Sequence, residues 1–122
     1  MRTVPRVACI NDLSGFGRCS LTTVLPVLSV MGVQACPVPT AVLSKHTGFP
    51  RFTFTDLTDS LEDYLERWND LYFDWIFVGF LGSLGQIEMI RRFFEMQKRK
   101  NPACRILLDP VMGASGKRYK KK

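Results

Sequence analysis

Histidine is almost absent from this sequence, and the cysteines show no metal-binding pattern. His46 is the only histidine, and no two cysteines are spaced as Cys-x-x-Cys. Structural zinc sites draw on Cys and His ligands at such short spacings, so we expect no zinc site. We expect reduced thiols, mostly buried in the core, at Cys9, Cys19, Cys36 and Cys104.

Long apolar runs are also lacking. A membrane-spanning helix needs about 18 or more consecutive apolar residues, and no run in this chain approaches that length. The start, MRTVPRVACINDLSGFG, has only a short apolar stretch and no small-residue cleavage site of the secretory type. We therefore expect a cytoplasmic protein that does not bind membranes. Its 122 residues, 46% hydrophobic and 23% charged, suit one globular domain.

The net charge of +6 comes mostly from the last six residues, 117–122, which hold five basic side chains. Outside this basic tail, 12 basic residues face 11 acidic ones. A nucleic-acid-binding domain usually carries its basic residues across a folded surface. We interpret the tail as a solvated end and do not expect nucleic acid to be the partner.

Short apolar runs alternate with segments of helical periodicity along the whole chain. The runs predict strands at Val4–Ile10, Val33–Leu43, Trp75–Val78 and Arg105–Leu108. Apolar stripes predict helices at Ser20–Met31, with a kink or a late start at Pro26, at Thr58–Leu71, and after a Ser83/Gln86 capping box. The order β-α-β-α-β-α-β, with strands apolar on both faces, predicts an α/β fold with a mainly parallel sheet and crossover helices.

Polar or glycine-rich segments follow each of the four predicted strands. They are Asn11–Asp12, Ser44–Thr47, Gly79–Ser83 and Asp109. In open α/β sheets, ligands bind beyond the carboxyl ends of the strands, so these segments predict a site at one edge. The segment SGFGRCS resembles a dinucleotide-binding turn, but Ser20 replaces its third glycine and no acidic residue ends the second strand. We therefore do not expect a nicotinamide or flavin site.

Three segments together resemble the pyridoxal/pyridoxamine kinases of the ribokinase-like superfamily. They are INDLSGFGRCSLTTVLPVLSVMGVQACPVPTAVLSKHTGFP, FVGFLGS and LLDPVMG, and they occur in the family's order. The related hydroxymethylpyrimidine phosphate kinases share part of the pattern. The resemblance implies a ribokinase-like three-layer sandwich, here incomplete, with residues 1–122 as the N-terminal part of a single domain.

The resemblance also implies an activity, which is transfer of the γ-phosphoryl group of ATP to the 5'-hydroxymethyl group of a B6 vitamer. Asp12 would contact the polar edge of the vitamer ring, and Phe80 would pack on the ring. Thr47 would hydrogen-bond the pyridine side, with His46 beside it. Asp109 would lie near the phosphates and help to hold Mg²⁺. ATP and Mg²⁺ are thus the expected co-substrate and cofactor, with a monovalent cation and a homodimer as further expectations.

This sequence departs from the family pattern at two points. Ala114 stands where the motif DPVMG usually continues with Asp, an acidic residue that would serve the metal–nucleotide end of the site. The family fold is about twice as long as this chain, and its second half would carry the catalytic base. We therefore expect a truncated chain with little activity alone. The alternatives are a catalytically silent protein that binds a vitamer or a partner, and a hydroxymethylpyrimidine kinase.

Overall fold

The computed structural model describes residues 4–81, 83–109, 113–114 and 117–118. Its larger elements follow the order expected for an α/β protein, with one additional strand. In chain order they are β1 (Arg6–Phe16), α1 (Leu21–Val30), β2 (Gln34–Lys45), β3 (Phe54–Asp56), α2 (Thr58–Glu66), β4 (Trp75–Val78), α3 (Gly85–Lys100) and β5 (Arg105–Leu108). Two short strands, β6 (Gly113–Ala114) and β7 (Lys117–Arg118), pair with each other, so the basic tail begins in a strand. Residues 119–122 of the tail lie outside the described residues.

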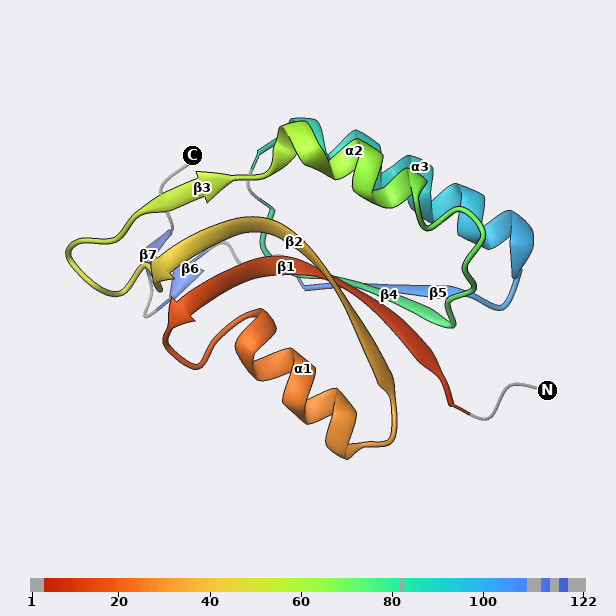
Figure 1. Ribbon diagram of the computed structural model, residues 1–122, viewed down its shortest axis with the longest axis horizontal. Helices are drawn as coiled ribbons and strands as arrows, with labels where there is room; N and C mark the ends of the chain where they lie inside the picture. Colours follow the sequence, from red (N-terminus) through yellow and green to blue (C-terminus); the bar gives the residue numbers. More distant parts are fainter. Residues whose placement is uncertain (1–3, 82, 110–112, 115–116, 119–122) are drawn as a thin grey trace.

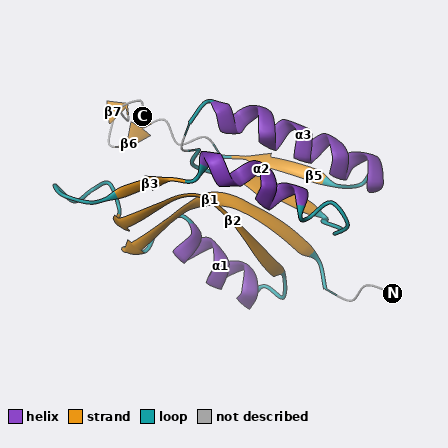
Figure 2. Ribbon diagram, turned by 45° about the horizontal axis from the view of Figure 1, so that its top comes forward, coloured by secondary structure: helices purple, strands orange, loops and turns teal. Residues whose placement is uncertain are grey.

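The main sheet has five strands in the order β3-β2-β1-β4-β5. The pairs β1–β2, β1–β4 and β4–β5 are parallel, and β3 alone runs antiparallel to its neighbour β2. Figure 1 shows α1 on one side of the sheet and α2 with α3 on the other, and Figure 2 shows the same layers from a turned view. The expected mainly parallel sheet between helical layers is confirmed.

Alternating residues of β1 divide the core between the two helical layers. Ala8 and Ile10 are fully buried in the cluster that includes residues of α2 and α3. Val7 and Cys9 point the other way and pack in the cluster that contains Leu21 of α1. Successive side chains of a strand point to opposite faces, so a central strand that is covered on both sides has to be apolar throughout. This requirement explains the run Val7–Ile10.

The first two strands are longer than the sequence indicated. The first strand was predicted to end at Ile10, but β1 continues to Phe16, and its pairing with β2 runs on to Phe16 and Lys45 after a register shift near Asn11. Gly15 permits this extension, since a Cβ there would lie only 3.0 Å from the carbonyl oxygen of Ser44. The short strand β3, whose Phe54 pairs with Leu43, was not among the predicted strands.

Three of the helix predictions need correction. The helix α2 ends at Glu66 and does not extend to Leu71. Pro26 lies inside α1, five residues after its first residue, so the helix does not start at the proline. The capping box before α3 does not form, because the side chains of Ser83 and Gln86 are engaged elsewhere: the Ser83 hydroxyl meets Thr58, and Gln86 is fully buried. The strands β4 and β5, in contrast, have the predicted bounds.

The cysteines are free thiols, as expected. Cys9 and Cys104 are fully buried, and Cys19 and Cys36 are partly exposed. Burial raises the pKa of Cys9 to about 11, and it also raises the pKa of Cys36 and of Cys104. Within the described residues, the helices are too short or too polar to cross a membrane.

Candidate functional site

Asn11, in the middle of β1, connects this strand to the segment that follows β4. Its side-chain oxygen accepts hydrogen bonds from the backbone N–H of Asp12 and of Phe80, each at 2.9 Å. Gly79 leaves room for this arrangement, because a Cβ there would lie 2.4 Å from Nδ2 of Asn11. The amide of Gly79 also donates to the carbonyl of Ile10 at 2.9 Å. Phe80 is therefore held beside Asp12 by a buried side chain and by the parallel pairing of β1 and β4.

Asp12 lies within β1, and its side chain bonds the residue that precedes α1. It is 6% exposed, and its two carboxylate oxygens accept from the hydroxyls of Ser20 at 2.6 Å and Ser14 at 3.1 Å. Ser20 is the N-cap of α1 and has a φ of 53°, a conformation that costs about 1–3 kcal/mol for most non-glycine residues. The hydrogen bond that Ser20 donates to Asp12 helps to hold Ser20 there, and a carboxylate near a helix N-terminus is favoured by the helix dipole. An ionised carboxylate has room for about four hydrogen bonds, so Asp12 retains acceptor capacity for a ligand.

A buried polar network lies at the same end of the sheet, on the side of α2 and α3. The hydroxyl of Thr40 donates to the carbonyl of Phe80 at 3.0 Å. The side-chain amide of Gln86 lies 3.1 Å from the carbonyl of Thr40, 2.9 Å from the hydroxyl of Thr58 and 3.2 Å from Asp56. These bonds tie β2, α2 and the start of α3 to the segment at Phe80. The backbone around the candidate site is thus fixed from both faces of the sheet.

His46 lies in a separate group at the far end of β2. Its ring is packed between two glycines, because a Cβ would lie 2.3 Å from Cδ2 at Gly17, where φ is +130°, and 2.7 Å from Cε1 at Gly48. The amide of Gly48 donates to Nδ1 of His46 at 3.0 Å. Nδ1 is therefore an acceptor, and a neutral ring carries its proton on Nε2, where it can donate to a ligand. The ring of Phe49 packs on it at 4.6 Å.

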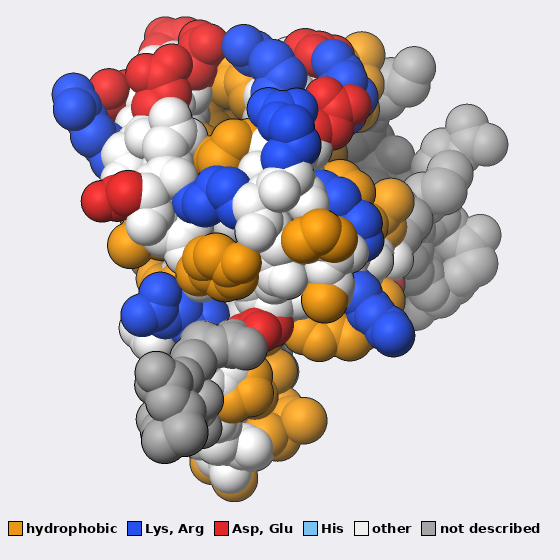
Figure 3. All heavy atoms as spheres, turned by 90° about the vertical axis from the view of Figure 1, so that its right-hand side faces the viewer, with side chains coloured by type: hydrophobic (Ala, Val, Ile, Leu, Met, Phe, Trp, Pro, Cys, Tyr) orange, Lys and Arg blue, Asp and Glu red, His pale blue; other side chains and the backbone are white. Residues whose placement is uncertain are grey.

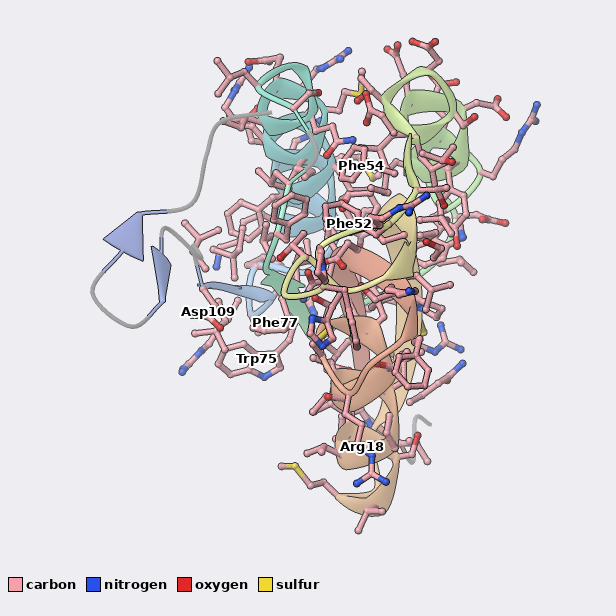
Figure 4. The ribbon with its side chains drawn as sticks, turned by 90° about the vertical axis from the view of Figure 1, so that its left-hand side faces the viewer. Arg18, Phe52, Phe54, Trp75, Phe77 and Asp109 are labelled. Atoms are coloured by element: carbon pink, nitrogen blue, oxygen red, sulfur yellow. The ribbon has the colours of Figure 1, made fainter. Side chains whose placement is uncertain are left out.

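Thr47 and Asp109 are both exposed at this end of the molecule. Thr47 follows His46 directly, so it belongs to the group at the end of β2. Asp109 follows β5, and its amide donates to the carbonyl of Val78 at 2.8 Å. Figure 4 shows this end, with Asp109 near Phe77. Because β1, β2, β4 and β5 are parallel, their carboxyl ends lie at one end of the sheet, but Asn11 and Asp12, which were expected to follow the first strand, lie within β1.

The described contacts divide the predicted site residues into two groups. Asp12 and Phe80 are linked through Asn11, and Asp109 lies one strand further along the sheet. His46 and Thr47 follow the β1–β2 pairing, which ends at Phe16 and Lys45. The His46 ring packs against Gly17, three residues before the Ser20 that bonds Asp12, so the two groups are neighbours.

Among the described residues, Asp109 is the only one that we expected to bind a metal ion. No cluster of three or more His, Cys, Asp or Glu side chains occurs in the described part of the chain. Mg²⁺ commonly binds proteins through one or two carboxylates and completes its shell with water and substrate phosphates. A single exposed carboxylate fits that mode of binding. The motif residues 110–112 lie outside the described residues.

The sequence did not reveal the roles of three residues that shape the site. Asn11 links Asp12 to Phe80, and Thr40 and Gln86 belong to the buried polar network. Asn11 was noted only for its position after a strand, and its partner Phe80 is 69 residues away. Thr40 and Gln86 are both fully buried polar residues. A polar residue at a position that should face the core is the signal that could have found them, since such groups are retained only with hydrogen-bond partners.

Comparison with known proteins relates the chain to kinases. No protein-family model matches it. The chain is 30% identical over 97 residues to pyridoxal kinase from Arabidopsis thaliana, a match that covers 75% of this chain and 31% of the relative. It is 32% identical over 98 residues to a pyridoxal kinase from Photobacterium profundum, covering 71% of this chain and 32% of the relative.

Solved structures give the same result for the fold. A Bacteroides thetaiotaomicron protein, provisionally described as a phosphomethylpyrimidine kinase, is 45% identical with a TM-score of 0.91 over 98% of this chain and 41% of its own. A second crystal form of that protein contains pyridoxal. Pyridoxal kinase from Lactobacillus plantarum is 28% identical with a TM-score of 0.81, covering 97% of this chain and 42% of its own. The pyridoxal kinase of Leishmania donovani in complex with ADP and pyridoxamine is 20% identical with a TM-score of 0.79, over 96% of this chain and 43% of its own, and shows the fold alone.

The matched relatives are much longer than this chain, which spans about a third of the two curated kinases and about two fifths of the solved structures. Within that span, the Bacteroides and Lactobacillus structures match 97% or more of this chain at 45% and 28% identity. By sequence and by fold, the chain therefore belongs to the ribokinase-like pyridoxal kinases and represents a part of their length.

Proposed function

We propose that this chain forms the acceptor-binding part of a kinase that transfers the γ-phosphoryl group of ATP to the 5'-hydroxymethyl group of a B6 vitamer. Such a reaction feeds the supply of pyridoxal 5'-phosphate. The observation that carries the proposal is the 45% identity, over nearly the whole chain, to a protein that was crystallised with pyridoxal. The polar end of the sheet supports it, because two groups of residues there present acceptor, donor and aromatic side chains.

Asp12 is the proposed contact to the polar edge of the vitamer ring. It is buried, it is held by two hydroxyls, and it can only accept hydrogen bonds when ionised. A ring hydroxyl or a protonated ring nitrogen is the kind of donor that it would bind. Phe80, whose backbone amide shares the Asn11 oxygen with that of Asp12, is the proposed aromatic contact, and stacking on such a ring contributes about 0.5–1.5 kcal/mol beyond the buried area.

Thr47 and His46 are proposed to contact the pyridine side of the vitamer. Both belong to the group at the end of β2, where the Thr47 side chain is exposed and can both donate and accept. The Gly48 amide fixes the orientation of the His46 ring and leaves Nε2 as its donor. These residues would bind and orient the acceptor before any transfer takes place.

Asp109 is proposed to face the phosphates and to supply one carboxylate to Mg²⁺, which neutralises phosphate charge during phosphoryl transfer. Ala114 offers no carboxylate at the next position of the motif. We therefore propose weak nucleotide binding and little or no turnover by these 122 residues alone. A monovalent cation, a homodimer and a cytoplasmic location stay predictions from the family resemblance.

A hydroxymethylpyrimidine kinase is the second candidate, because the Bacteroides protein is described as a phosphomethylpyrimidine kinase. Both acceptors are heteroaromatic rings with a hydroxymethyl group. The remaining alternative is a catalytically silent protein that binds a vitamer.

The test is calorimetric titration of pyridoxal and of hydroxymethylpyrimidine into the chain and into two variants. Asp12→Asn keeps the shape of the side chain and removes its charge, so it should weaken pyridoxal binding by roughly 10-fold or more, because hydrogen bonds to charged groups contribute about 1.5–3 kcal/mol. Asp70→Asn, at an exposed carboxylate far along the chain, is the matched control and should bind as the parent does.

Thermal melting of both variants separates lost binding from lost folding, since Asp12 also bonds the N-cap of α1. Tighter binding of hydroxymethylpyrimidine than of pyridoxal would show that the acceptor is the pyrimidine and not the vitamer. Equal pyridoxal affinity in a folded Asp12→Asn variant and in Asp70→Asn would refute the assigned role of Asp12.

A further inference from the structure

A small cavity lies between α2 and α3, and we call it the α2–α3 cavity. Its apolar lining consists of Leu65 from α2 and of Met89, Phe93 and Met96 from α3. Leu65 and Phe93 are each only 4% exposed and belong to the core, and the two methionines are partly buried against it. None of the lining residues belongs to the candidate site, so the proposed function does not account for this cavity.

The size of the cavity indicates what it can hold. Its volume is about 160 Å³. Pockets for whole small-molecule ligands and cofactors usually measure about 300–1,000 Å³, so this cavity is too small for them. An apolar cavity of roughly 150 Å³ can hold a benzene-sized group. Methionine side chains adapt to such a group because they are unbranched and flexible. The cavity therefore fits one large apolar side chain of a partner.

The polar rim of the cavity carries more negative than positive charge. The rim consists of Glu62, Glu66, Asn69 and Arg92. Arg92 pairs with Glu62 at 3.3 Å across the two helices, so these two charges compensate each other. Glu66 is exposed and forms no ion pair with another described residue. One uncompensated carboxylate therefore lies beside the apolar lining.

Glu66 also lies at an electrostatically unfavourable place. It is the last residue of α2, and this helix has no basic residue in its last turn. The C-terminal end of a helix carries partial negative charge, which favours a nearby cation and disfavours an anion. Arg67, the next residue, pairs with Asp63 at 3.3 Å. A cation that approaches from outside would be stabilised by Glu66 and by the end of the helix together.

The surface around α2 has the same sign of charge. The segment 58–70 contains five acidic residues and one basic residue, all of them exposed. Figure 3 shows acidic side chains gathered at the top of the molecule, over α2, with hydrophobic side chains visible beside them. Such a surface attracts basic segments and repels acidic ones. The charge and the apolar cavity thus favour the same kind of partner.

We propose that the α2–α3 cavity is a docking site for a basic helical segment of a partner protein. One large apolar side chain of that segment fills the cavity, and a lysine or arginine on the same face of the segment pairs with Glu66. Amphipathic helices commonly bind in this way, by placing anchor side chains in an apolar groove. The inference is independent of the proposed function, because no residue of the cavity takes part in it.

The first test uses a fluorescein-labelled helical peptide of alanine and lysine with a single central phenylalanine. Fluorescence anisotropy measures its binding to the 122-residue chain. Replacing the phenylalanine of the peptide by alanine should weaken binding by roughly 10-fold or more, because burial of the aromatic ring is lost. Equal binding of the two peptides would show only a general attraction between opposite charges and would overturn the proposal.

The second test changes the rim. Glu66→Lys should weaken binding of the phenylalanine peptide by roughly 5- to 10-fold, because a repelling charge replaces the pairing carboxylate. Glu95→Lys is the matched control, since Glu95 is an exposed carboxylate on α3 that does not line the cavity. Both substitutions change the net charge equally, so a general electrostatic effect would be the same in both. Equal affinities of the two variants would contradict the assigned role of Glu66.

A third measurement locates the peptide without any substitution in the chain. Met89 and Met96 line the cavity, whereas Met31 is 68% exposed at the end of α1, on the other side of the sheet. NMR of labelled methionine methyl groups follows these residues separately. The bound phenylalanine peptide should shift the signals of Met89 and Met96 and leave that of Met31 in place. A shift at Met31, or no shift at saturation, would refute the docking site.

Discussion

Asn11 and Gly79 fit together with no space for a side chain between them. A Cβ at Gly79 would lie 2.4 Å from Nδ2 and 2.7 Å from Cγ of Asn11. The side-chain oxygen of Asn11 accepts a hydrogen bond from the backbone N–H of Phe80. The position of Phe80, which is a proposed vitamer contact, therefore depends on the absence of a side chain at the preceding residue.

Gly79→Ala should lower the free energy of unfolding by about 1–3 kcal/mol, the usual range for inserting a methyl group into a packed site. The loss arises because Asn11 has to move, which breaks its bonds to two backbone amides. Thermal or urea unfolding measures the change. Gly85→Ala is the control, since its Cβ would meet atoms no closer than 3.8 Å at the start of α3.

Gly85→Ala is expected to be neutral or to stabilise the protein slightly, because Ala favours a helix over Gly by up to about 1 kcal/mol. Equal stabilities of the two variants would show that Asn11 does not occupy the position described.

Thr47→Ala should weaken pyridoxal binding by roughly 2- to 10-fold, the equivalent of one hydrogen bond of about 0.5–1.5 kcal/mol. Thr47 is exposed, so the fold should tolerate the change. Thr23→Ala, at an exposed threonine on α1, provides the matched control, and calorimetry gives both affinities. If the two variants bind pyridoxal equally well, the SKHTG segment does not contact the acceptor.

The sequence was sufficient for those parts of the fold that depend on local pattern. The bounds of β4 and β5 follow from short apolar runs next to breakers, and both were predicted to the residue. The parallel arrangement follows from strands that are apolar on both faces. The common end of the strands, and hence the region of the candidate site, follows from that arrangement alone.

The remaining features depend on contacts between distant residues, which local pattern does not encode. Gly15 was interpreted as a turn residue, but it serves to let β1 approach β2 closely. Gln86 matched a helix cap by spacing, yet it is used to bond Thr40, which is 46 residues away. The strand β3 did leave a signal, since the segment Phe-Thr-Phe-Thr that ends at Thr55 alternates with the period of a strand.

Stability should fall as the pH rises from about 9 toward about 11, in part because of Cys9. Burial, with a smaller contribution from Cys36, raises the pKa of Cys9 from 9.0 to about 11. Above pH 9 the unfolded chain loses the Cys9 thiol proton while the folded protein keeps it. The free energy of unfolding therefore decreases as the pH rises, up to about pH 11. The contribution of Cys9 to this fall is about 2 kcal/mol.

Urea unfolding at a series of pH values measures this fall. Cys9→Ala removes the titrating group and should give a flatter dependence on pH over the same range. Parallel curves for the parent and the variant would show that the Cys9 thiol titrates alike in the folded and unfolded states.

Gln86→Leu should cost about 1–3 kcal/mol of stability, because it removes the donor to the buried carbonyl of Thr40 and leaves that oxygen without this partner. Gln34→Leu is the matched control at an exposed glutamine whose bond to Arg6 lies on the surface. Urea unfolding compares the two. A loss of stability no greater than that of Gln34→Leu would show that the network around Thr40 does not hold the site.

The most direct test of the central claim is a parallel titration of pyridoxal and of Mg·ATP into the 122-residue chain. We expect saturable pyridoxal binding with a dissociation constant on the order of 1 mM, as a few hydrogen bonds and one stacked ring in an open site would give. Mg·ATP should show no saturation at that concentration, since Asp109 alone is assigned to the phosphates. Tight binding of Mg·ATP, or no binding of pyridoxal, would contradict the account of this chain as the acceptor-binding part of a B6 kinase.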